Sequence, residues 1–277
     1  MEPIQIRTGV KDIKAGLEHT VVLDTNRRVY AWGSNEYNHI NSSNNKIIMT
    51  PYMITDYSEL IGAGDYQTYY HGTDFELCGI GKNEKGMISN NLHSLFYIQK
   101  ISCGDKHAAA IDLNGQLWVW GDNSKGQLGT ILSNGESYTV EPINTGIYAD
   151  NIYAGENITA YIEGGQVYQS GNVYEEDNSE FKRIGNSVGI VDLSLGNTFS
   201  VGIDANDNLW RWGKMTDNDG FSDIQSNNPL KIEYDYAFSQ VDSYRNQSLA
   251  IDELGQVLAW GEGYYADGSD SMKICTY

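Results

Sequence analysis

A spaced pair of glycines recurs six times along this chain of 277 residues. The copies follow one another every 40 to 51 residues, a period typical of propellers and solenoids. The first position of the pair, which we call the anchor, is occupied by Gly16, Gly64, Gly104, Gly155, Gly196 and, in the sixth copy, Tyr244. The second glycine follows 17 residues later at Gly33, Gly81, Gly121, Gly213 and Gly261, and one residue earlier in the fourth copy, at Gly171. Two markers at a fixed interval indicate a repeat architecture.

All six tryptophans fall at two positions of this repeat. Four of them, Trp32, Trp120, Trp212 and Trp260, directly precede the second glycine. The other two, Trp118 and Trp210, lie two residues before one of those four. Residues two apart on a strand lie on the same side of it, so we expect these indoles to form a buried sheet face.

The third copy indicates four strands. We expect the first near residues 96–98, corresponding to 140–143 in the next copy, and the second to end at Gly104. The third and fourth cover 107–111 and 116–121, joined by a turn whose Asn and Gly accept positive φ. The prolines at positions 3, 51, 142 and 229 lie 13 to 15 residues before an anchor, where we expect the first residue of an edge strand.

Several of these strands are apolar on both faces, as in sheets that are stacked between neighbours. We therefore predict an all-β fold: a single closed β-propeller of six four-stranded antiparallel blades, with residues 1–277 as one domain. The residues outside the five intervals between the six anchors amount to one repeat, which suits a ring that closes on itself. Residues 272–275 resemble the strand at 3–6, and we expect one of the two to complete a blade begun at the other end of the chain.

Charge limits the classes of partner. Eighteen basic against 37 acidic residues give a formal net charge of −19, which repels nucleic acid and anionic lipid surfaces. No stretch has the length and apolar character of a membrane span, and the amino terminus lacks the features of a signal peptide, so we expect synthesis in the cytoplasm. The three cysteines, Cys78, Cys103 and Cys275, suggest neither a disulfide framework nor a zinc site, and we expect buried, reduced thiols and no cofactor.

The residues at fixed places in the copies carry a family resemblance. The third copy has Gly104, His107, Asp112, Gly115, Trp120, Gly121, Asn123 and the run Gly126, Gln127, Leu128, Gly129. The first keeps Gly16, His19, Trp32, Gly33 and Asn35 but has Asn38, His39 and Ile40 where the run should be, and the second and fourth have Ile80 and Ser170 in place of the tryptophan. This pattern resembles the regulator of chromosome condensation repeat, which implies a β-propeller of the bacterial or phage type. The family includes a nucleotide-exchange factor for a small GTPase, an inhibitor of β-lactamases and many bacterial and phage proteins, so the resemblance is far less specific for function.

The histidines are consistent with either a structural role or a ligand role. His19 and His107 match the family's histidine, and we expect both to be buried and hydrogen-bonded to backbone, with a ligand role as the alternative. His39, His71 and His93 look isolated in the sequence. No copy offers a Ser, His and acid set or a Cys and His set, so we expect no enzyme; an active site in a central channel is the alternative.

Two acidic segments allow other chemistry. Asp217, Asp219 and Asp223 around Gly220 resemble a short calcium loop without its distal glutamate, and a plain acidic turn is the other interpretation. Residues 175–177 read as a solvated loop, and so we predict no metal site.

Loops are the sites we expect to bind. Two variable residues follow each anchor, and we predict that they gather as a ring on one propeller face: Leu17, Glu18, Asp65, Tyr66, Asp105, Lys106, Glu156, Asn157, Asn197, Thr198, Arg245 and Asn246. An ordinary solvated rim is the alternative interpretation. Insertions at 41–58, 130–141, 172–180 and 214–228 are further candidates, with tyrosines in or beside such loops at positions 37, 52, 57, 66, 264 and 265.

These observations favour a non-catalytic scaffold that recognises a protein or a cell-surface glycan. We expect a particle-associated protein, part of a virion as a phage tail or tail-like component that binds a receptor. The alternatives are a soluble inhibitor or regulator that caps one target protein and, less favoured, an enzyme.

Overall fold

The computed structural model describes residues 5–88, 90–173, 176–185, 189–214, 225–261 and 273–275. Strands make up nearly all of the regular structure described, and the helical elements there are two short 3-10 helices, η1 (Asn90–Ser94) and η2 (Ser133–Gly135). None of the helices described could span a bilayer. The chain divides into two compact units, unit 1 with Met1–Asp122 and Ser137–Ile147, and unit 2 with Asn123–Glu136 and Tyr148–Tyr277.

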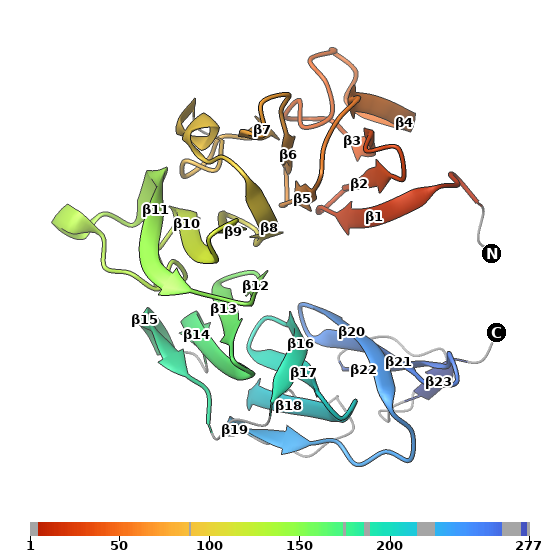
Figure 1. Cartoon of the computed structure of the whole chain (residues 1–277), viewed down its shortest axis with the longest axis vertical. Helices are drawn as coiled ribbons and strands as arrows, with labels where there is room; N and C mark the ends of the chain where they lie inside the picture. The colour runs from red at the N-terminus through yellow and green to blue at the C-terminus, as the bar shows by residue number, and fades with distance from the viewer. Residues whose placement is uncertain are drawn as a thin grey trace. The chain divides into compact units, whose positions relative to one another are not determined.

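Unit 1 contains three antiparallel sheets, which we call blades 1 to 3 (Figure 1). Blade 1 consists of β1 (Val10–Ala15), β2 (His19–Asp24), β3 (Val29–Ser34) and β4 (Ile47–Thr55). Blade 2 consists of β5 (Ile61–Ala63), β6 (Gln67–His71) and β7 (Leu77–Gly81). Blade 3 consists of β8 (Ile98–Cys103), β9 (His107–Asp112), β10 (Gln116–Asp122) and β11 (Tyr138–Tyr148). In each sheet the strands pair in chain order.

Unit 2 contains blades 4 to 6, again with strands that pair in chain order. Blade 4 consists of β12 (Asn151–Ala154), β13 (Ile158–Glu163), β14 (Gln166–Val173) and β15 (Glu176–Arg183). Blade 5 consists of β16 (Ile190–Leu195), β17 (Phe199–Asp204), β18 (Leu209–Lys214) and β19 (Gln225–Lys231). Blade 6 consists of β20 (Phe238–Tyr244), β21 (Gln247–Asp252), β22 (Val257–Gly261) and β23 (Lys273–Cys275).

The apolar core lies between consecutive sheets, as the two-sided apolar strands predict. Between blades 2 and 3, the fully buried Trp120 lies opposite Ala108 and shares a cluster with Tyr69, Met87 and Ala110. The small alanines leave room for the indole on the neighbouring strand. Trp212 and Trp260 are buried in the same way in unit 2, and the other three tryptophans are half-buried. The predicted buried indole face is confirmed for Trp120, Trp212 and Trp260.

The anchor and the second glycine are required by close approaches. A side chain at Gly16 would overlap the His19 ring and the main-chain oxygen of Gly64 in the next blade. At Gly33, φ is 114° and a Cβ would lie 2.5 Å from the main-chain oxygen of Glu18. All six second glycines have φ between 97° and 125°, a region that L side chains rarely adopt. The glycine pair therefore holds the end of the third strand against the loop that follows the first.

The outermost strands show that the boundary between repeats lies one strand away from the predicted boundary. Residues 140–143 belong to β11, which completes blade 3, whereas the sequence assigned them to the start of the next copy. Pro51, Pro142 and Pro229 lie on edge strands as predicted, but inside β4, β11 and β19 and not at their first residues. A strand between two repeats can pair with either neighbour, and sequence periodicity does not distinguish the two.

Blade 2 has three full strands. Its fourth strand is reduced to residues 95–97, where Phe96 forms an isolated bridge with Glu76 and the Leu77 amide donates to the Leu95 carbonyl at 2.8 Å. The short helix η1 occupies the segment just before this bridge.

The carboxyl-terminal strand also differs from its prediction. β23 pairs with β22 and completes blade 6 from its own end of the chain, so residues 273–275 do not complete a blade begun at the amino terminus. The predicted fold class, an all-β propeller with six antiparallel blades, is confirmed. Closure of the blades into one ring and a single domain over residues 1–277 stay predictions.

Candidate functional site

The twelve predicted loop residues follow the anchors in the structure as they do in the sequence, and all are at least partly exposed. Within unit 1, the Leu17 amide donates to the Asp65 carbonyl at 3.2 Å, so the anchor loops of blades 1 and 2 lie side by side. Within unit 2, the Asn197 amide donates to the Arg245 carbonyl at 2.7 Å and joins the loops of blades 5 and 6. The structure thus brings neighbouring anchor loops together inside each unit, and their role in binding stays a prediction.

Five of the six loops are held by the same backbone hydrogen bond. The second loop residue accepts a hydrogen bond from the amide that follows the second glycine, as Glu18 does from Ser34 at 2.8 Å and Tyr66 from Lys82 at 3.0 Å. The same bond recurs at Lys106, Asn157 and Thr198. Because the main chain is fixed, the side chains on these loops are presented without a large ordering cost, which favours binding.

Aromatic side chains gather on the loops of blades 1 and 2. The Tyr37 and Tyr66 rings lie 4.8 Å apart, and the Lys82 ammonium is 4.8 Å from the Tyr37 ring centre and 5.5 Å from that of Tyr66. Lys82 also pairs with Glu84, which raises the pKa of Lys82. We call Glu18, Tyr37, Tyr66 and Lys82 the tyrosine patch. All four side chains are at least partly exposed, and the patch combines apolar contact area with charges of both signs.

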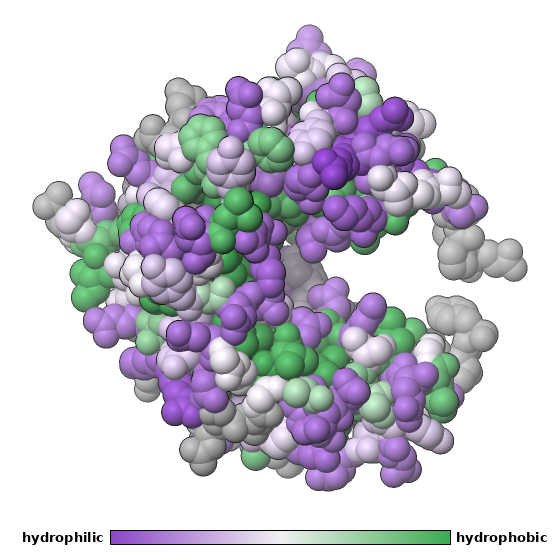
Figure 2. Space-filling view, viewed as in Figure 1, coloured by the Kyte–Doolittle hydropathy of each residue, from purple (hydrophilic) through white to green (hydrophobic). Residues whose placement is uncertain are grey.

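Acidic groups lie in the patch and beside it. Burial, followed by the nearby carboxylates of Glu18 and Asp65, raises the pKa of Tyr66, so this phenol is protonated at neutral pH. Hydrophilic residues cover much of the face drawn in Figure 2, with apolar groups between them. This agrees with the excess of acidic residues in the sequence.

Two buried histidines, His19 and His39, lie on the inner side of the tyrosine patch. The rings of His19 and His39 are 4.5 Å apart, and His39 lies 6.1 Å from the Tyr66 ring. Burial and then His39 lower the pKa of His19 to about 3, and burial lowers that of His39, so both are neutral at pH 7. The expectation that His39 is isolated is therefore wrong: the fold places it against His19.

The burial predicted for His19 and His107 is confirmed, and His19 has a side-chain partner as well. Its Nε2 lies 3.2 Å from the Thr68 hydroxyl of blade 2, which in turn donates to the His39 carbonyl at 2.7 Å. A hydrogen bond with the Gln67 backbone is also present, as predicted. The histidine thus links two blades, a structural role.

Lys82 was missed by the sequence analysis. It directly follows Gly81, and in the five copies where this position is described it is tied to the anchor loop, so the repeat register could have pointed to it. Tyr37 was expected on a loop, yet nothing in the sequence places it beside Tyr66. That neighbourhood depends on how blade 1 packs against blade 2 inside unit 1.

The insertions and acidic segments need correction. Residues 47–55, 138–141, 176–180 and 225–228 belong to outer strands β4, β11, β15 and β19, so these parts of the insertions are sheet edges. Residues 176 and 177 pair with β14 and are not in a loop. Tyr52 is exposed, and Tyr57 is half-buried. The candidate calcium loop at Asp217–Asp223, together with Tyr264 and Tyr265, falls outside the described residues.

The cysteines are less buried than predicted. Cys78 and Cys103 are free and half-buried, and burial raises their pKa to about 11 and about 12, so both are thiols at neutral pH. Nothing is described of the Cys275 side chain.

Among the residues with described side chains, one group of metal-ligating atoms comes together: Glu76, Cys78 and His93, all within 4.8 Å of one another. His93 is therefore not isolated, contrary to its prediction.

Comparison with known proteins identifies the repeat. Residues 10–38 and 98–127 match the model of the regulator of chromosome condensation (RCC1) repeat. The first stretch runs from β1 to the loop after β3, and the second from β8 to the loop after β10. These are the two copies that retain most of the signature residues.

The chain is similar to two curated regulatory proteins. It is 25% identical over 134 residues to the X-linked retinitis pigmentosa GTPase regulator of Homo sapiens, a match that covers 42% of this chain and 13% of the relative. It is 24% identical over 284 residues to the ultraviolet-B receptor UVR8 of Arabidopsis thaliana, covering 90% of this chain and 64% of the receptor. The matches span less than two thirds of either relative.

A solved structure gives the same fold. Prp20p from Saccharomyces cerevisiae, characterised together with its binding properties to Gsp1p and histones, superposes with a TM-score of 0.76 at 18% identity. The superposition covers 96% of this chain and 76% of Prp20p. With its six antiparallel sheets, this chain is a β-propeller that carries matches to the RCC1 repeat in blades 1 and 3.

Proposed function

We propose that this chain is a non-catalytic scaffold that binds a protein partner through its anchor loops, with the tyrosine patch of unit 1 at the centre of the contact. The observation that carries the proposal is the packing of Tyr37, Tyr66 and Lys82 on loops whose main chain is fixed by hydrogen bonds. Paired tyrosines give large contact area at little entropy cost and are common at the centres of protein interfaces.

The class of partner follows from charge and from the relatives. Glu18, Asp65 and Asp105 lie on neighbouring anchor loops of a chain with a net charge of −19. Such a surface favours a partner with exposed lysine and arginine side chains, and the association rate should fall as salt screens this attraction. The binding of Prp20p to Gsp1p and histones supports a protein, and not a glycan, as the ligand class.

Site-specific crosslinking tests the proposal. A photoreactive amino acid is placed at Glu18, inside the patch, and in a matched control at Met49, which is 82% exposed on the outer strand β4. In host-cell lysate we expect an adduct from position 18. Excess wild-type protein, added as a competitor, should abolish this adduct, whereas an excess of the Tyr66→Ala, Lys82→Ala double variant should not. Equal adducts from both positions, or equal competition by the double variant, would contradict the proposed surface.

The non-catalytic part of the proposal is supported by relatives that are a receptor and a regulator. Its test is an exchange assay with purified small GTPases loaded with a fluorescent nucleotide. We expect the spontaneous release rate to be unchanged by the chain. Accelerated release would make the chain an exchange factor and overturn this part.

For the biological setting, we propose a component of a phage tail or tail-like particle, with a free regulator of one target protein as the alternative. The support is the resemblance to a family that includes phage proteins. Particles purified on a density gradient should contain the chain in a fixed ratio to the other structural proteins. Recovery only as a soluble complex with one cytosolic protein would favour the alternative.

A further inference from the structure

The outer turn of blade 2 departs from the other blades at two positions. In blades 3 and 5, the indole nitrogens of Trp118 and Trp210 donate to the carboxylates of Asp112 and Asp204, at 3.0 and 2.8 Å. The pairing of β6 with β7 places Gly72 and Cys78 at the equivalent positions of blade 2. A thiol therefore stands in the place of an indole, and the turn carboxylate is missing from its usual position.

Glu76 supplies a carboxylate from the other side of the turn. Its Oε2 accepts a hydrogen bond from the Asp74 amide at 3.0 Å, the role that Asp112 plays for the Asn114 amide in blade 3. A side chain at Gly72 would overlap this carboxylate, so the glycine makes room for it. Oε1 is left facing Cys78, whose Sγ lies 3.8 Å away. Glu76 and Cys78 are two residues apart and lie on the same side of the strand.

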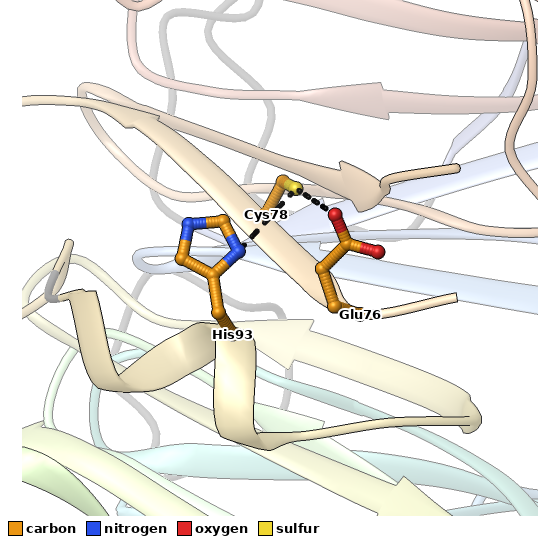
Figure 3. Close-up of side chains that lie close together, drawn as sticks. All are labelled: Glu76, Cys78 and His93. Atoms are coloured by element: carbon orange, nitrogen blue, oxygen red, sulfur yellow. Dashed lines mark hydrogen bonds between the residues drawn. The ribbon is translucent and has the colours of Figure 1, made fainter. Parts of the chain in front are cut away.

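The third member comes from η1. Leu92 and Leu95, on either side of His93, are buried in the core between blades 2 and 3 and fix the position of the helix. Gly79 on β7 allows this close approach, because a Cβ there would lie 3.1 Å from Leu92. His93 then points back toward β7, with Nδ1 4.0 Å from the Cys78 sulfur (Figure 3). Carboxylate, thiol and imidazole thus converge from two segments of the chain.

The three donor atoms have the spacing of a metal site. Two ligands on a tetrahedral zinc ion, with bonds of about 2.0 to 2.3 Å, are separated by roughly 3.5 Å. The Cys78 sulfur lies 3.8 Å from Oε1 and 4.0 Å from Nδ1, and all three donor atoms lie within 4.8 Å of one another, so the cluster must close around an ion. Thiolate, imidazole and carboxylate together suit zinc and cobalt better than the harder magnesium or calcium. Metal binding releases the thiol proton of Cys78 to solvent, and the resulting thiolate together with one carboxylate matches the charge of a divalent cation.

We propose that Glu76, Cys78 and His93 bind a zinc-type divalent metal, which attaches η1 to the edge strand β7 of blade 2. The fourth position of a tetrahedral ion is open to water or to a ligand from outside the cluster. The site lies where blade 2 lacks a full fourth strand, so the metal would connect segments that a strand ladder joins in the other blades. The inference is independent of the proposed function, because no residue of the tyrosine patch takes part.

Cobalt binding tests the site directly. Tag-free, metal-free protein is titrated with Co²⁺ alone, and the near-ultraviolet charge-transfer band that only a cobalt–thiolate bond produces is recorded. We expect saturation at one equivalent with the visible bands of tetrahedral cobalt, and loss of these signals on addition of Zn²⁺. Absence of a charge-transfer band at micromolar protein would overturn the proposal.

Matched variants distinguish this site from other ligands. Cys78→Ser should abolish the charge-transfer band, whereas Cys103→Ser and Cys275→Ser should retain it. His93→Gln and Glu76→Gln should each weaken Co²⁺ binding by at least 10-fold, roughly the loss that even an outer-shell change produces. Circular dichroism shows whether each variant is folded. An unchanged titration in folded Cys78→Ser, or equal loss in Cys103→Ser, would contradict the assignment.

Discussion

Blades 2 and 3 of unit 1 are neighbours with the same strand register, yet they are stabilised differently. In blade 3, Asp112 accepts bonds from two turn amides and the Trp118 indole, and Trp120 fills the space against blade 2. In blade 2, the positions of Asp112, Trp118 and Trp120 hold Gly72, Cys78 and Ile80. The fourth strand has shrunk to a single bridge, and a Glu, Cys and His cluster lies at the edge. The repeat tolerates loss of its signature where other contacts hold the outer strand, and such a copy is free to acquire new chemistry.

Replacing the buried indole should have the largest effect. Trp120→Ala removes a fully buried ring and the bond from its Nε1 to the Met87 carbonyl, and we expect a loss of about 3–5 kcal/mol in the free energy of unfolding. Ile80→Ala, at the same position of blade 2, removes a half-buried side chain and should cost clearly less. Urea unfolding measures both. Equal losses would mean that the two blades do not differ in this way.

Acid should destabilise the fold through the paired histidines of blade 1. The pKa of His19 falls from 6.5 to about 3 on folding, so its contribution to stability is complete above pH 6.5 and is lost as the pH falls toward 3. The slope should approach about 1.4 kcal/mol per pH unit for this one proton. His19→Gln, which copies Gln67 at the same position of blade 2, should flatten the curve. An unchanged slope in unfolding curves measured from pH 7 to 4 would contradict the neutral, buried histidine.

Removal of the turn carboxylate should lower the free energy of unfolding more in blade 3 than in blade 2. Asp112→Ala leaves two turn amides and an indole without their acceptor, and we expect a loss of about 1–3 kcal/mol. Glu76→Ala removes one bond from the Asp74 amide at an exposed turn, and about 0.5–1 kcal/mol is expected without metal. Thermal unfolding in a chelating buffer compares them. A larger loss for Glu76→Ala would reverse the proposed ranking.

The smallest effect is expected where a signature glycine is missing from blade 1. Asn38 has φ = 58° at the position where the third copy has Gly126, with φ = 79°. Asparagine tolerates this region better than most residues, so Asn38→Gly should change the free energy of unfolding by no more than about 1 kcal/mol. Gly126→Ala should cost more, because a Cβ there would overlap the Asn178 carbonyl. Chemical denaturation of the pair is the measurement. A large gain from Asn38→Gly would show that Asn38 is strained.

Much of the fold could be predicted from the sequence because the glycines and tryptophans mark the inner hairpin of every blade. The bond between residues such as Glu18 and Ser34 recurs at a fixed interval and leaves a clear signal. The outer strands could not be placed, since β4 and β11 follow connections of variable length. Their pairing partner is decided by packing, which a repeat period does not report.

The functional sites could likewise be predicted from the sequence only where they belong to the repeat. The anchor loops could be named from the sequence because they are part of the repeat. Tyr37 meets Tyr66, and His93 meets Cys78, only through the packing of neighbouring segments. In the second case the position of η1 depends on Leu92 fitting beside Gly79. No spacing rule links residues that are brought together in this way.

Hydrogen exchange at the edge of blade 2 tests most directly whether this blade is held by its cluster. The amides of β7 and β10 are compared by mass spectrometry in metal-free protein, with and without added Zn²⁺. We predict that β7 exchanges faster than β10, and that Zn²⁺ slows β7 in the wild type but not in Cys78→Ser. Protection of β7 equal to that of β10 and indifferent to Zn²⁺ would contradict the account.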